Sequence, residues 1–344
     1  MLKASFSNFS KKLLLATIFV ITLLMLTHVA QISYTETNIE PVASLRYASP
    51  KYMSVMYAVT SGIMPRAPMS QNQMEDVRHE LDRRRQWVTR VCETIDSKRS
   101  HPDATLKNMI IDTEHNVSWC PIYKAASSTW MNYFAVLKGA STDAITDLVR
   151  RDLIQISDIV KQKYRQNVDF NKTYEKVSKT KKFLIVRHPL ERLLSAYRDK
   201  LEHMQNREYY YKRFGRRIVL KYRQPGNATT KLEPTFAEFL RFIVSEKHFD
   251  EHWIPYYRTC EPCIIRYDYI LKFETLERDQ NFLIQETNLS EYLHERNYSQ
   301  NINPMGVTNR KILHEYIQGI SRSLLDEVNK IYENDYKLFN YSYI

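Results

Sequence analysis

The chain has 344 residues, of which 50 are Lys or Arg and 39 are Asp or Glu, so the formal net charge is +11; only 6 residues are Gly. A chain of this length can bury a full core in one large domain or two small ones. Neither G-x-G-x-x-G nor G-x-x-x-x-G-K-[ST] occurs, which excludes an ordinary dinucleotide fingerprint and a Walker P-loop as motifs. The positive charge favours an acidic partner such as a nucleotide, an anionic glycan or a lipid surface; a merely soluble basic surface is the alternative.

The N-terminal region predicts a membrane anchor. Residues 13–30 are mainly apolar and follow a lysine-containing tail, residues 1–12. By the positive-inside rule, the tail is cytosolic and the rest of the chain is luminal. A cleaved signal peptide is the competing interpretation, which the length of the run and the lack of a small-x-small site disfavour. Residues 31–75 then form a stem, and residues 76–344 form one luminal domain.

The first half of this domain alternates helical and extended patterns. Apolar residues at near-helical spacing predict a helix over 74–92. The run Arg83–Arg85 on it predicts a solvated face, with a grip on a polyanion as the less favoured alternative. We expect a strand over 117–122, a helix over 127–137 and helical segments within 149–164.

The second half continues the alternation. A strand over 183–186 precedes a helix whose apolar face runs through 190–201, and the basic, aromatic segment 209–223 is expected near an acceptor. The remaining predicted elements are helices at 235–245 and 311–332 and strand material at 263–273. Helices alternating with apolar strands indicate an α/β fold with a central, mostly parallel sheet flanked by helices.

The cysteines and glycosylation sequons agree with a luminal domain. The chain has 4 cysteines, all beyond the predicted anchor: Cys92, Cys120, Cys260 and Cys263. An even number in an oxidising lumen predicts disulfides, and Cys260 and Cys263 could form a local bridge. A zinc site lacks a second ligand pair, so a structural disulfide is favoured over zinc or redox chemistry. Several Asn-x-Ser/Thr sequons also follow the anchor.

Two segments combine a strand, a tight polar loop and a helix. The first is Lys124-Ala-Ala-Ser-Ser-Thr-Trp130, and the second runs from Phe183 through Arg187 to Arg198. In each, backbone N–H groups and a helix N-terminus converge on one spot, which suits a phosphate or sulfate. Two such anion sites indicate a ligand with two separate anionic ends.

Four segments in chain order carry a resemblance to a known family: Lys124–Trp130, Val186–Lys200, the C-x-P-C…Y-D-x-I-x-K-F-E-T-L block at 260–276, and the tyrosine-rich 331–341. Together, over about residues 83–343, they resemble the Golgi carbohydrate sulfotransferases, in the branch that includes the chondroitin and dermatan 4-O-sulfotransferases and the HNK-1 sulfotransferase. The resemblance implies a P-loop-like sulfotransferase fold. The chain departs from the family pattern at Tyr123, Ser127 and His188.

The resemblance also implies the donor 3′-phosphoadenosine 5′-phosphosulfate, PAPS, with no metal. It assigns Arg187 and Ser195 to the 3′-phosphate. It assigns the first segment to the 5′-phosphosulfate group, namely Lys124, Ala125, Ala126, Ser127, Ser128, Thr129 and Trp130. The residues alone leave other interpretations open. Lys124 could be a surface lysine, Arg187 a cation at a strand end and Ser195 a serine in the interior of a helix.

The implied reaction is in-line transfer of a sulfuryl group to a sugar hydroxyl. A positioned Lys124 ammonium would stabilise the charge that grows on the leaving phosphate. The acceptor hydroxyl needs a general base, and His252 is our candidate, with a packed structural histidine as the equal alternative. Glu191 and His188 are weaker candidates because they lie within the donor segment.

Sequence reasoning therefore favours a Golgi-membrane, single-pass type II sulfotransferase. Its acceptor would be a glycosaminoglycan or a glycoprotein glycan, with the chondroitin/dermatan 4-O type favoured. The alternatives are a metal-independent Golgi glycosyltransferase and a non-catalytic glycan-binding type II membrane protein. Metal-dependent glycosyltransferases commonly carry Asp-x-Asp, which is absent from the chain. The sequence predicts no nucleic-acid partner and does not define the oligomeric state.

Overall fold

We analysed a computed structural model of the chain. It describes residues 68–95, 102–140, 143–151, 153–165, 169–224, 231–293 and 306–344. The predicted tail and anchor, and nearly all of the predicted stem, lie outside these residues. Within the described part, no helix is both long and apolar enough to cross a membrane. The described residues belong to one compact unit, Pro65–Ile344, and the predicted domain boundary at 76 falls inside its first helix, α3 (Gln71–Cys92).

The core of this unit is a four-stranded mixed sheet in the order β1-β2-β3-β4. Strand β1 (Ile110–Asp112) pairs antiparallel with β2 (Val117–Cys120). Strands β2, β3 (Lys181–Val186) and β4 (Tyr269–Lys272) are parallel. The last four residues of β3, Phe183–Val186, are apolar and buried, so this part of the strand is covered on both faces. The α/β fold with a mostly parallel sheet is confirmed, and the carboxyl ends of three strands meet at one edge.

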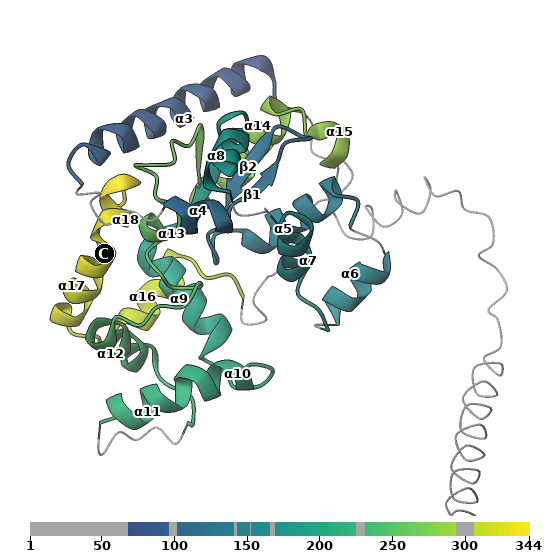
Figure 1. The fold of residues 1–344 in the computed structure, drawn as a ribbon. Helices are drawn as coiled ribbons and strands as arrows, with labels where there is room; N and C mark the ends of the chain where they lie inside the picture. Colours follow the sequence, from purple (N-terminus) through teal and green to yellow (C-terminus); the bar gives the residue numbers. More distant parts are fainter. Residues whose placement is uncertain are drawn as a thin grey trace, which may run out of the picture. The chain divides into compact units, whose positions relative to one another are not determined.

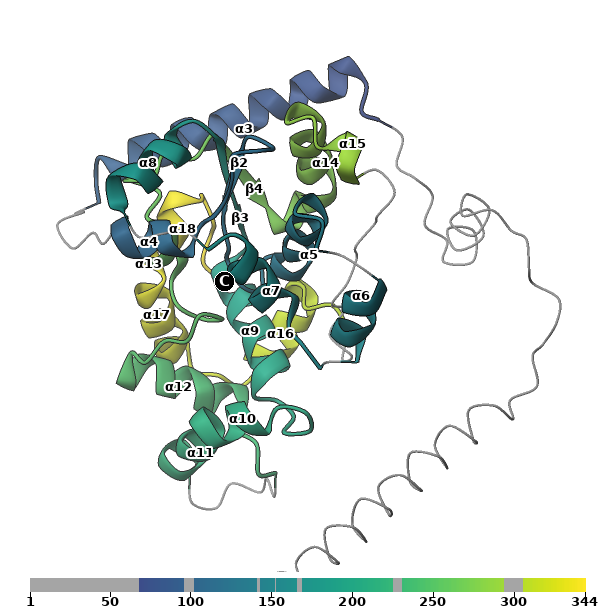
Figure 2. The same cartoon turned by 45° about the vertical axis from the view of Figure 1, so that its right-hand side comes forward.

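Helices cover the sheet and extend beyond it (Figure 1). Helix α3 packs along β4 and α14 (Leu276–Glu286), while α5 (Ser127–Leu137) packs on α7 (Ile156–Lys163). The other helices of the part of the unit that contains the sheet are α4 (Pro102–Asn108), α6 (Asp143–Arg150), α8 (Phe170–Ser178), α13 (Tyr256–Cys260) and α15 (Ser290–Leu293). Both views place α3 at one end of the unit and α11 at the other (Figures 1 and 2).

A second hydrophobic core lies away from the sheet. Helix α9 (Pro189–Lys200) contributes Leu193 and Leu194 to it, and aliphatic and aromatic side chains from other helices complete it. These helices are α10 (Glu208–Tyr210), the π-helix at Tyr211–Gly215, α11 (Arg216–Tyr222), α12 (Phe236–Glu246), α16 (Arg310–Ile317), α17 (Arg322–Ile331) and α18 (Glu333–Leu338). Because α9 starts at the sheet edge and ends in this second core, it links the two halves of the unit.

Two disulfides cross the fold. Cys92 is bonded to Cys263 and Cys120 to Cys260, with Cα–Cα distances of 5.3 and 5.8 Å. The predicted local bridge between Cys260 and Cys263 is therefore wrong. Cys260 is the last residue of α13 and is bonded to Cys120 in β2. Cys263 lies in the turn that follows and is bonded to Cys92 at the end of α3. Both bonds close long loops, which restricts the unfolded chain.

The predicted elements agree with the structure in the first half and less well in the second. Helix α5 has the predicted bounds, and β3 contains the predicted strand. Of the strand material expected over 263–273, only β4 is a strand. The helix predicted over 311–332 is two helices, because Gly319 has φ +79° between them and Ser321 then caps α17.

Candidate active site

The β2–α5 loop forms the first wall of the candidate site. Lys124 and Ala126 both have left-handed backbones, with φ of +69° and +59°. Residues other than glycine adopt this region at a cost, typically where function requires it. The turn carries the chain directly into α5, which has no side-chain cap at its N-terminus. The first-turn N–H groups of α5 and its positive dipole end therefore suit an anion.

Arg187 follows β3 and joins the β3–α9 loop to the β2–α5 loop. Its Nη1 donates to the carbonyl of Lys124 at 3.0 Å, and its Nη2 donates to the carbonyl of Thr308. The guanidinium lies 4.2 Å from the ring centroid of Phe273. Its Nε is buried without a hydrogen-bond partner among the described residues. Burial lowers the pKa of Arg187 to about 10, so the side chain keeps its charge at neutral pH.

Helix α9 turns one face toward the β2–α5 loop. Arg192 is buried, and its Nε donates to the carbonyl of Tyr123 at 2.8 Å. One and two turns away, the same face carries Ser195 and Asp199, since residues three and four apart align on a helix. Asp199 also contacts the loop, through Lys124. Ser195, half-buried between two loop-contacting residues, therefore faces the same loop.

Lys124 lies in a charge cluster at the end of α9. Its Nζ is 3.0 Å from Asp199 Oδ2, which is also 3.2 Å from the Nζ of Lys200. Burial lowers the pKa of Lys124, and the charge of Asp199 opposes this shift. Burial alone would raise the pKa of Asp199, but the charges of Lys124 and Lys200 hold it well below its usual range. The carboxylate therefore holds the Lys124 head group in place.

His252 packs against the same loop. Its ring lies 4.9 Å between centroids from the ring of Tyr123, the residue before Lys124, in a tilted arrangement with an interplanar angle of 48°. Its Nδ1 is 2.5 Å from Asp250 Oδ1 and 3.4 Å from the hydroxyl of Tyr210. Asp250 thus holds the proton on Nδ1 and leaves Nε2 as the acceptor. Burial lowers the pKa of His252, and Asp250 partly offsets this, so the ring is neutral at pH 7.

Hydrogen bonds to Asp335 and to Arg187 hold the segment that follows His252 in place. The backbone N–H groups of Tyr256 and Tyr257 donate to the Asp335 carboxylate at 3.0 and 2.8 Å, which caps α13. Burial raises the pKa of Asp335 to about 7, and these N–H groups oppose the shift. The Tyr256 hydroxyl donates to the Arg187 carbonyl at 2.9 Å. The segment that follows His252 is therefore hydrogen-bonded to the residue that ends the β3 side of the site, Arg187, through Tyr256.

The structure brings most of the predicted site residues together. Lys124 belongs to the β2–α5 loop, and Arg187 and His252 contact it. Ser195 lies on α9 between Arg192 and Asp199, which contact the same loop. Ser127 is buried at the start of α5, whereas Ser128 and Thr129 are partly exposed. His188 packs between aromatic rings and contacts the Ser342 carbonyl, which identifies it as a structural residue.

Two of the predicted anion contacts are buried beneath the loop. Trp130 lies beside Phe183, and its backbone N–H donates to the Ala126 carbonyl. Its indole Nε1 has no hydrogen-bond partner among the described residues. Ala125 is also fully buried, and its N–H donates to the Ile122 carbonyl. The backbone donors of both residues are therefore used within the protein, and their assignment to the donor stays a prediction.

Sequence reasoning missed Asp199, Tyr210 and Asp250. Asp250 could have been found, because an acid two residues before a candidate histidine base can orient its ring. Asp199 could have been found from its helical spacing to Ser195. Tyr210 gave no signal, because only the tertiary fold brings the π-helix region to His252.

One acidic group of the described residues has metal-like geometry. Asp112, Glu114 and His115 lie at the β1–β2 turn. This turn is at the edge of the sheet opposite the strand ends that carry Lys124 and Arg187. Asp112 already accepts hydrogen bonds from Tyr164 at 2.7 Å and contacts His115 at 2.8 Å. The group therefore serves as a support for the turn in this structure and is separate from the candidate active site.

Comparisons with known proteins identify the family. The sulfotransferase family matches residues 107–342 of the chain. Carbohydrate sulfotransferase 11 of Mus musculus is 30% identical over 273 residues, which is 75% of this chain and 75% of the relative. Carbohydrate sulfotransferase 9 of Homo sapiens is 26% identical over 319 residues, which is 90% of this chain and 71% of the relative. Carbohydrate sulfotransferase 14 of Danio rerio is 30% identical over 244 residues, which is 69% of this chain and 62% of the relative.

The chain belongs to the sulfotransferase family. Its matched region contains Lys124, Arg187, Ser195 and His252. No solved structure matches the chain. Family membership makes the protein a sulfotransferase and decides against both a glycosyltransferase and a non-catalytic glycan-binding protein.

Proposed function

We propose that the protein transfers a sulfuryl group from PAPS to a hydroxyl of a carbohydrate. The contact between Arg187 and the Lys124 carbonyl is the observation that carries this proposal. It joins two strand-to-helix anion loops at neighbouring carboxyl strand ends. A ligand with an anionic group at each end fits such a pair of loops, and PAPS is the donor that sulfotransferases use.

The residues fit this donor. Ala126, Ser127, Ser128 and Thr129 lie where the α5 N-terminus favours the 5′-phosphosulfate. A guanidinium has five N–H donors, and two of those on Arg187 are used within the protein. The remaining donors, including the unpartnered Nε, are left for the 3′-phosphate. Ser195 faces the same loop and adds a hydroxyl.

Catalysis then divides between two side chains. Lys124, held by Asp199, lies where negative charge develops on the leaving 5′-phosphate and stabilises it electrostatically. His252 accepts the proton of the acceptor hydroxyl at Nε2 while Asp250 holds the proton on Nδ1. As the new S–O bond forms, the bond from sulfur to the bridging oxygen breaks, and no redox step occurs. Bound PAPS supplies only the activated sulfuryl group.

The acceptor and the location complete the proposal. The relatives are named carbohydrate sulfotransferases, which supports a glycan acceptor, and we favour a glycosaminoglycan of the chondroitin or dermatan type with transfer to a 4-hydroxyl. The two disulfides support an oxidising compartment. We propose a single-pass type II protein of the Golgi membrane, with residues 76–344 in the lumen.

The test is a transfer assay with labelled PAPS across a panel of glycans, followed by disaccharide analysis of the product. We expect label on a glycan hydroxyl, strongest with unsulfated chondroitin or dermatan. Label on none of the glycans, from protein that binds adenosine 3′,5′-bisphosphate, would refute the carbohydrate acceptor. Label on a different glycan would keep the reaction and replace the favoured acceptor.

A further inference from the structure

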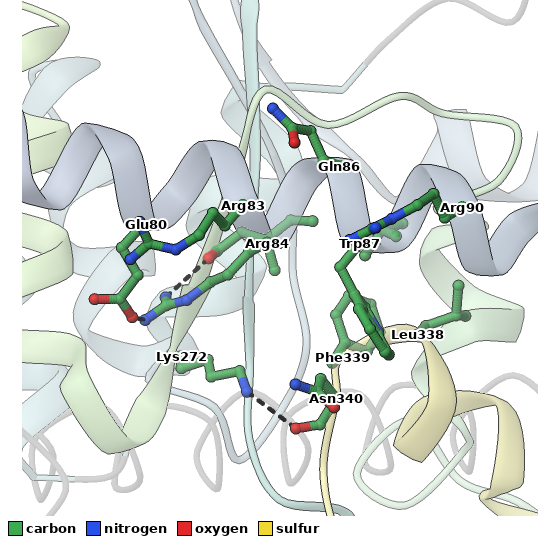
Figure 3. Close-up of a pocket in the computed structure, with 12 residues that line it drawn as sticks. Glu80, Arg83, Arg84, Gln86, Trp87, Arg90, Lys272, Leu338, Phe339 and Asn340 are labelled. Carbon is green, nitrogen blue, oxygen red and sulfur yellow. Dashed lines mark hydrogen bonds and ion pairs between the residues drawn. The ribbon is translucent and has the colours of Figure 1, made fainter.

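A groove outside the candidate active site lies between α3 and the C-terminal segment (Figure 3). It has a volume of 370 Å³. Its lining residues are Glu80, Arg83, Arg84, Gln86, Trp87, Val88, Arg90, Ile270, Lys272, Leu338, Phe339 and Asn340. None of them belongs to the loops that we assign to PAPS. We propose that this groove binds the extended part of an acidic polysaccharide acceptor.

The wall formed by α3 presents an aromatic ring between two cations. Arg83, Trp87 and Arg90 follow one another at spacings of four and three residues, so they share one helix face. All three are exposed, and the Arg90 guanidinium lies 5.6 Å from the Trp87 ring centroid. The indole is fixed, because Trp87 Nε1 donates to the Lys337 carbonyl at 2.9 Å. A fixed, exposed ring can pack against the C–H face of a sugar, and guanidiniums pair with its carboxylate or sulfate groups.

The charges of the groove are not balanced. Arg84 is neutralised, since it pairs with Glu80 and with Asp279 at 2.6 Å. Arg83 and Arg90 have no ion pair with any described residue, and the same holds for Lys272, whose Nζ reaches the Asn340 carbonyl at 3.5 Å (Figure 3). Three cations without an ion pair to any described residue therefore border one groove, whose acidic residue Glu80 is paired with Arg84. This excess of positive charge favours a polyanion over a neutral glycan or a protein helix.

The groove is continuous with the sheet edge that carries the candidate active site. Lys272 pairs in register with Val186, the residue before Arg187. The next residue, Phe273, packs under the Arg187 guanidinium. His252 contacts the loop after β2, two strands away, which is about 10 Å along the sheet edge. A glycan that touches both places must therefore be longer than a disaccharide, so the groove would act only on acceptors longer than that.

The Arg83–Arg85 run thus divides into different roles. Arg84 is a partly buried cation paired with Glu80 and Asp279, and Arg85 pairs with Asp82 at 2.7 Å outside the groove. Of the three, only Arg83 lines the groove without an ion pair to a described residue. Arg85 therefore provides a control with the same charge on the same helix.

The experiment rests on the proposed function and compares two acceptors, a chondroitin disaccharide and unsulfated chondroitin polymer. Arg83→Glu and Arg90→Glu should each raise the KM for the polymer about fivefold, with kcat and the disaccharide kinetics unchanged. Trp87→Ala should act in the same direction. Arg85→Glu should leave the KM for both acceptors unchanged. Added salt should reduce the difference in polymer KM between the unchanged protein and the Arg83→Glu variant, since salt screens exposed charges.

Two results would overturn the groove assignment. The first is an equal polymer KM for the unchanged protein and the Arg83→Glu variant. The second is an equal rise of the polymer KM in the Arg85→Glu and Arg83→Glu variants, because the total charge of the protein would then explain the effect. Binding to phosphatidylserine vesicles that depends on Arg83, with polymer kinetics unaffected, would reassign the groove to a membrane surface. If the unchanged protein sulfates neither acceptor, the proposed function fails, and direct binding of the polymer to the Arg83 and Arg85 variants tests the groove separately.

Discussion

The donor-facing and acceptor-facing halves of the proposed site are built in different ways. The donor half consists of two continuous loops, each following a strand of the sheet, and its anion-binding groups are largely backbone N–H groups and Arg187. The acceptor half gathers His252, Asp250 and Tyr210 from separate segments. The difference suggests that the donor half tolerates changes of side chain, apart from its cations, whereas the acceptor half depends on individual side chains and their supports.

Replacement of Lys124 should have the largest effect, because it is the one side chain of the loop placed for the leaving group. We expect Lys124→Ala to lower kcat about 10³-fold, the scale seen when a preorganised electrostatic group is removed. Lys200→Ala is the matched control, since Lys200 shares Asp199 at 3.2 Å and leaves Lys124 in place. Initial rates and thermal unfolding of both variants would check this. Equal losses would mean that total positive charge matters and the position of Lys124 does not.

Replacement of His252 tests the acceptor half alone. His252→Ala should lower kcat about 10²-fold, the scale of general base catalysis, while the affinity for adenosine 3′,5′-bisphosphate stays the same. Asp250→Asn should cause a smaller loss, because the ring stays in place but its tautomer is less firmly fixed. Turnover and calorimetric binding should be measured side by side. Loss of nucleotide binding in His252→Ala would show that the two halves are not separable.

The pH dependence of kcat should reflect His252. Burial lowers the pKa of its ring from the usual 6.5. A base acts in its neutral form, which predominates above its pKa, so the rate should fall only as pH falls through this lowered value. At pH 6.5 the enzyme should therefore keep more than half of its maximal kcat. A half-maximal point above pH 7 would contradict the assignment of this residue as the base.

Ser195 should show the smallest effect, because the donor half has other groups for the same phosphate. Ser195→Ala should raise the KM for PAPS about tenfold with little change in kcat, since a hydrogen bond from a neutral hydroxyl to a charged phosphate contributes about 1.5 kcal/mol. Ser178→Ala is a control at the end of α8, where the hydroxyl donates to the Glu175 carbonyl. Donor titrations at saturating acceptor would measure both. A kcat change larger than the KM change would move Ser195 from donor binding to catalysis.

The sequence predicted the donor half well, because its information is local. A buried strand, a polar loop and a helix follow one another without interruption at Lys124 and at Arg187, so spacing and composition suffice. Resemblance to a family sharpened the assignment. Burial is what the motif did not indicate, since Trp130 lies fully inside the core and its backbone N–H is used by the Ala126 carbonyl.

The other features depend on tertiary structure. The disulfide partners of Cys260 and Cys263 are 140 and 171 residues away, so spacing in a C-x-x-C motif could not identify them. Asp335 caps α13 from another helix, and Tyr210 reaches His252 across 42 positions. The break at Gly319 has a local cause, a left-handed glycine, that the helical pattern on either side concealed.

The most direct test of the account is calorimetric titration of the detergent-solubilised full chain with adenosine 3′,5′-bisphosphate, compared with Arg187→Ala. The account predicts one bound nucleotide per chain, with affinity weakened about 30-fold in the variant, because a hydrogen bond to a charged group contributes about 2 kcal/mol. Thermal unfolding would establish that the variant is folded. Absence of binding by the unchanged protein, or equal affinity of the folded variant, would contradict the claim that the two loops hold the two anionic ends of the donor.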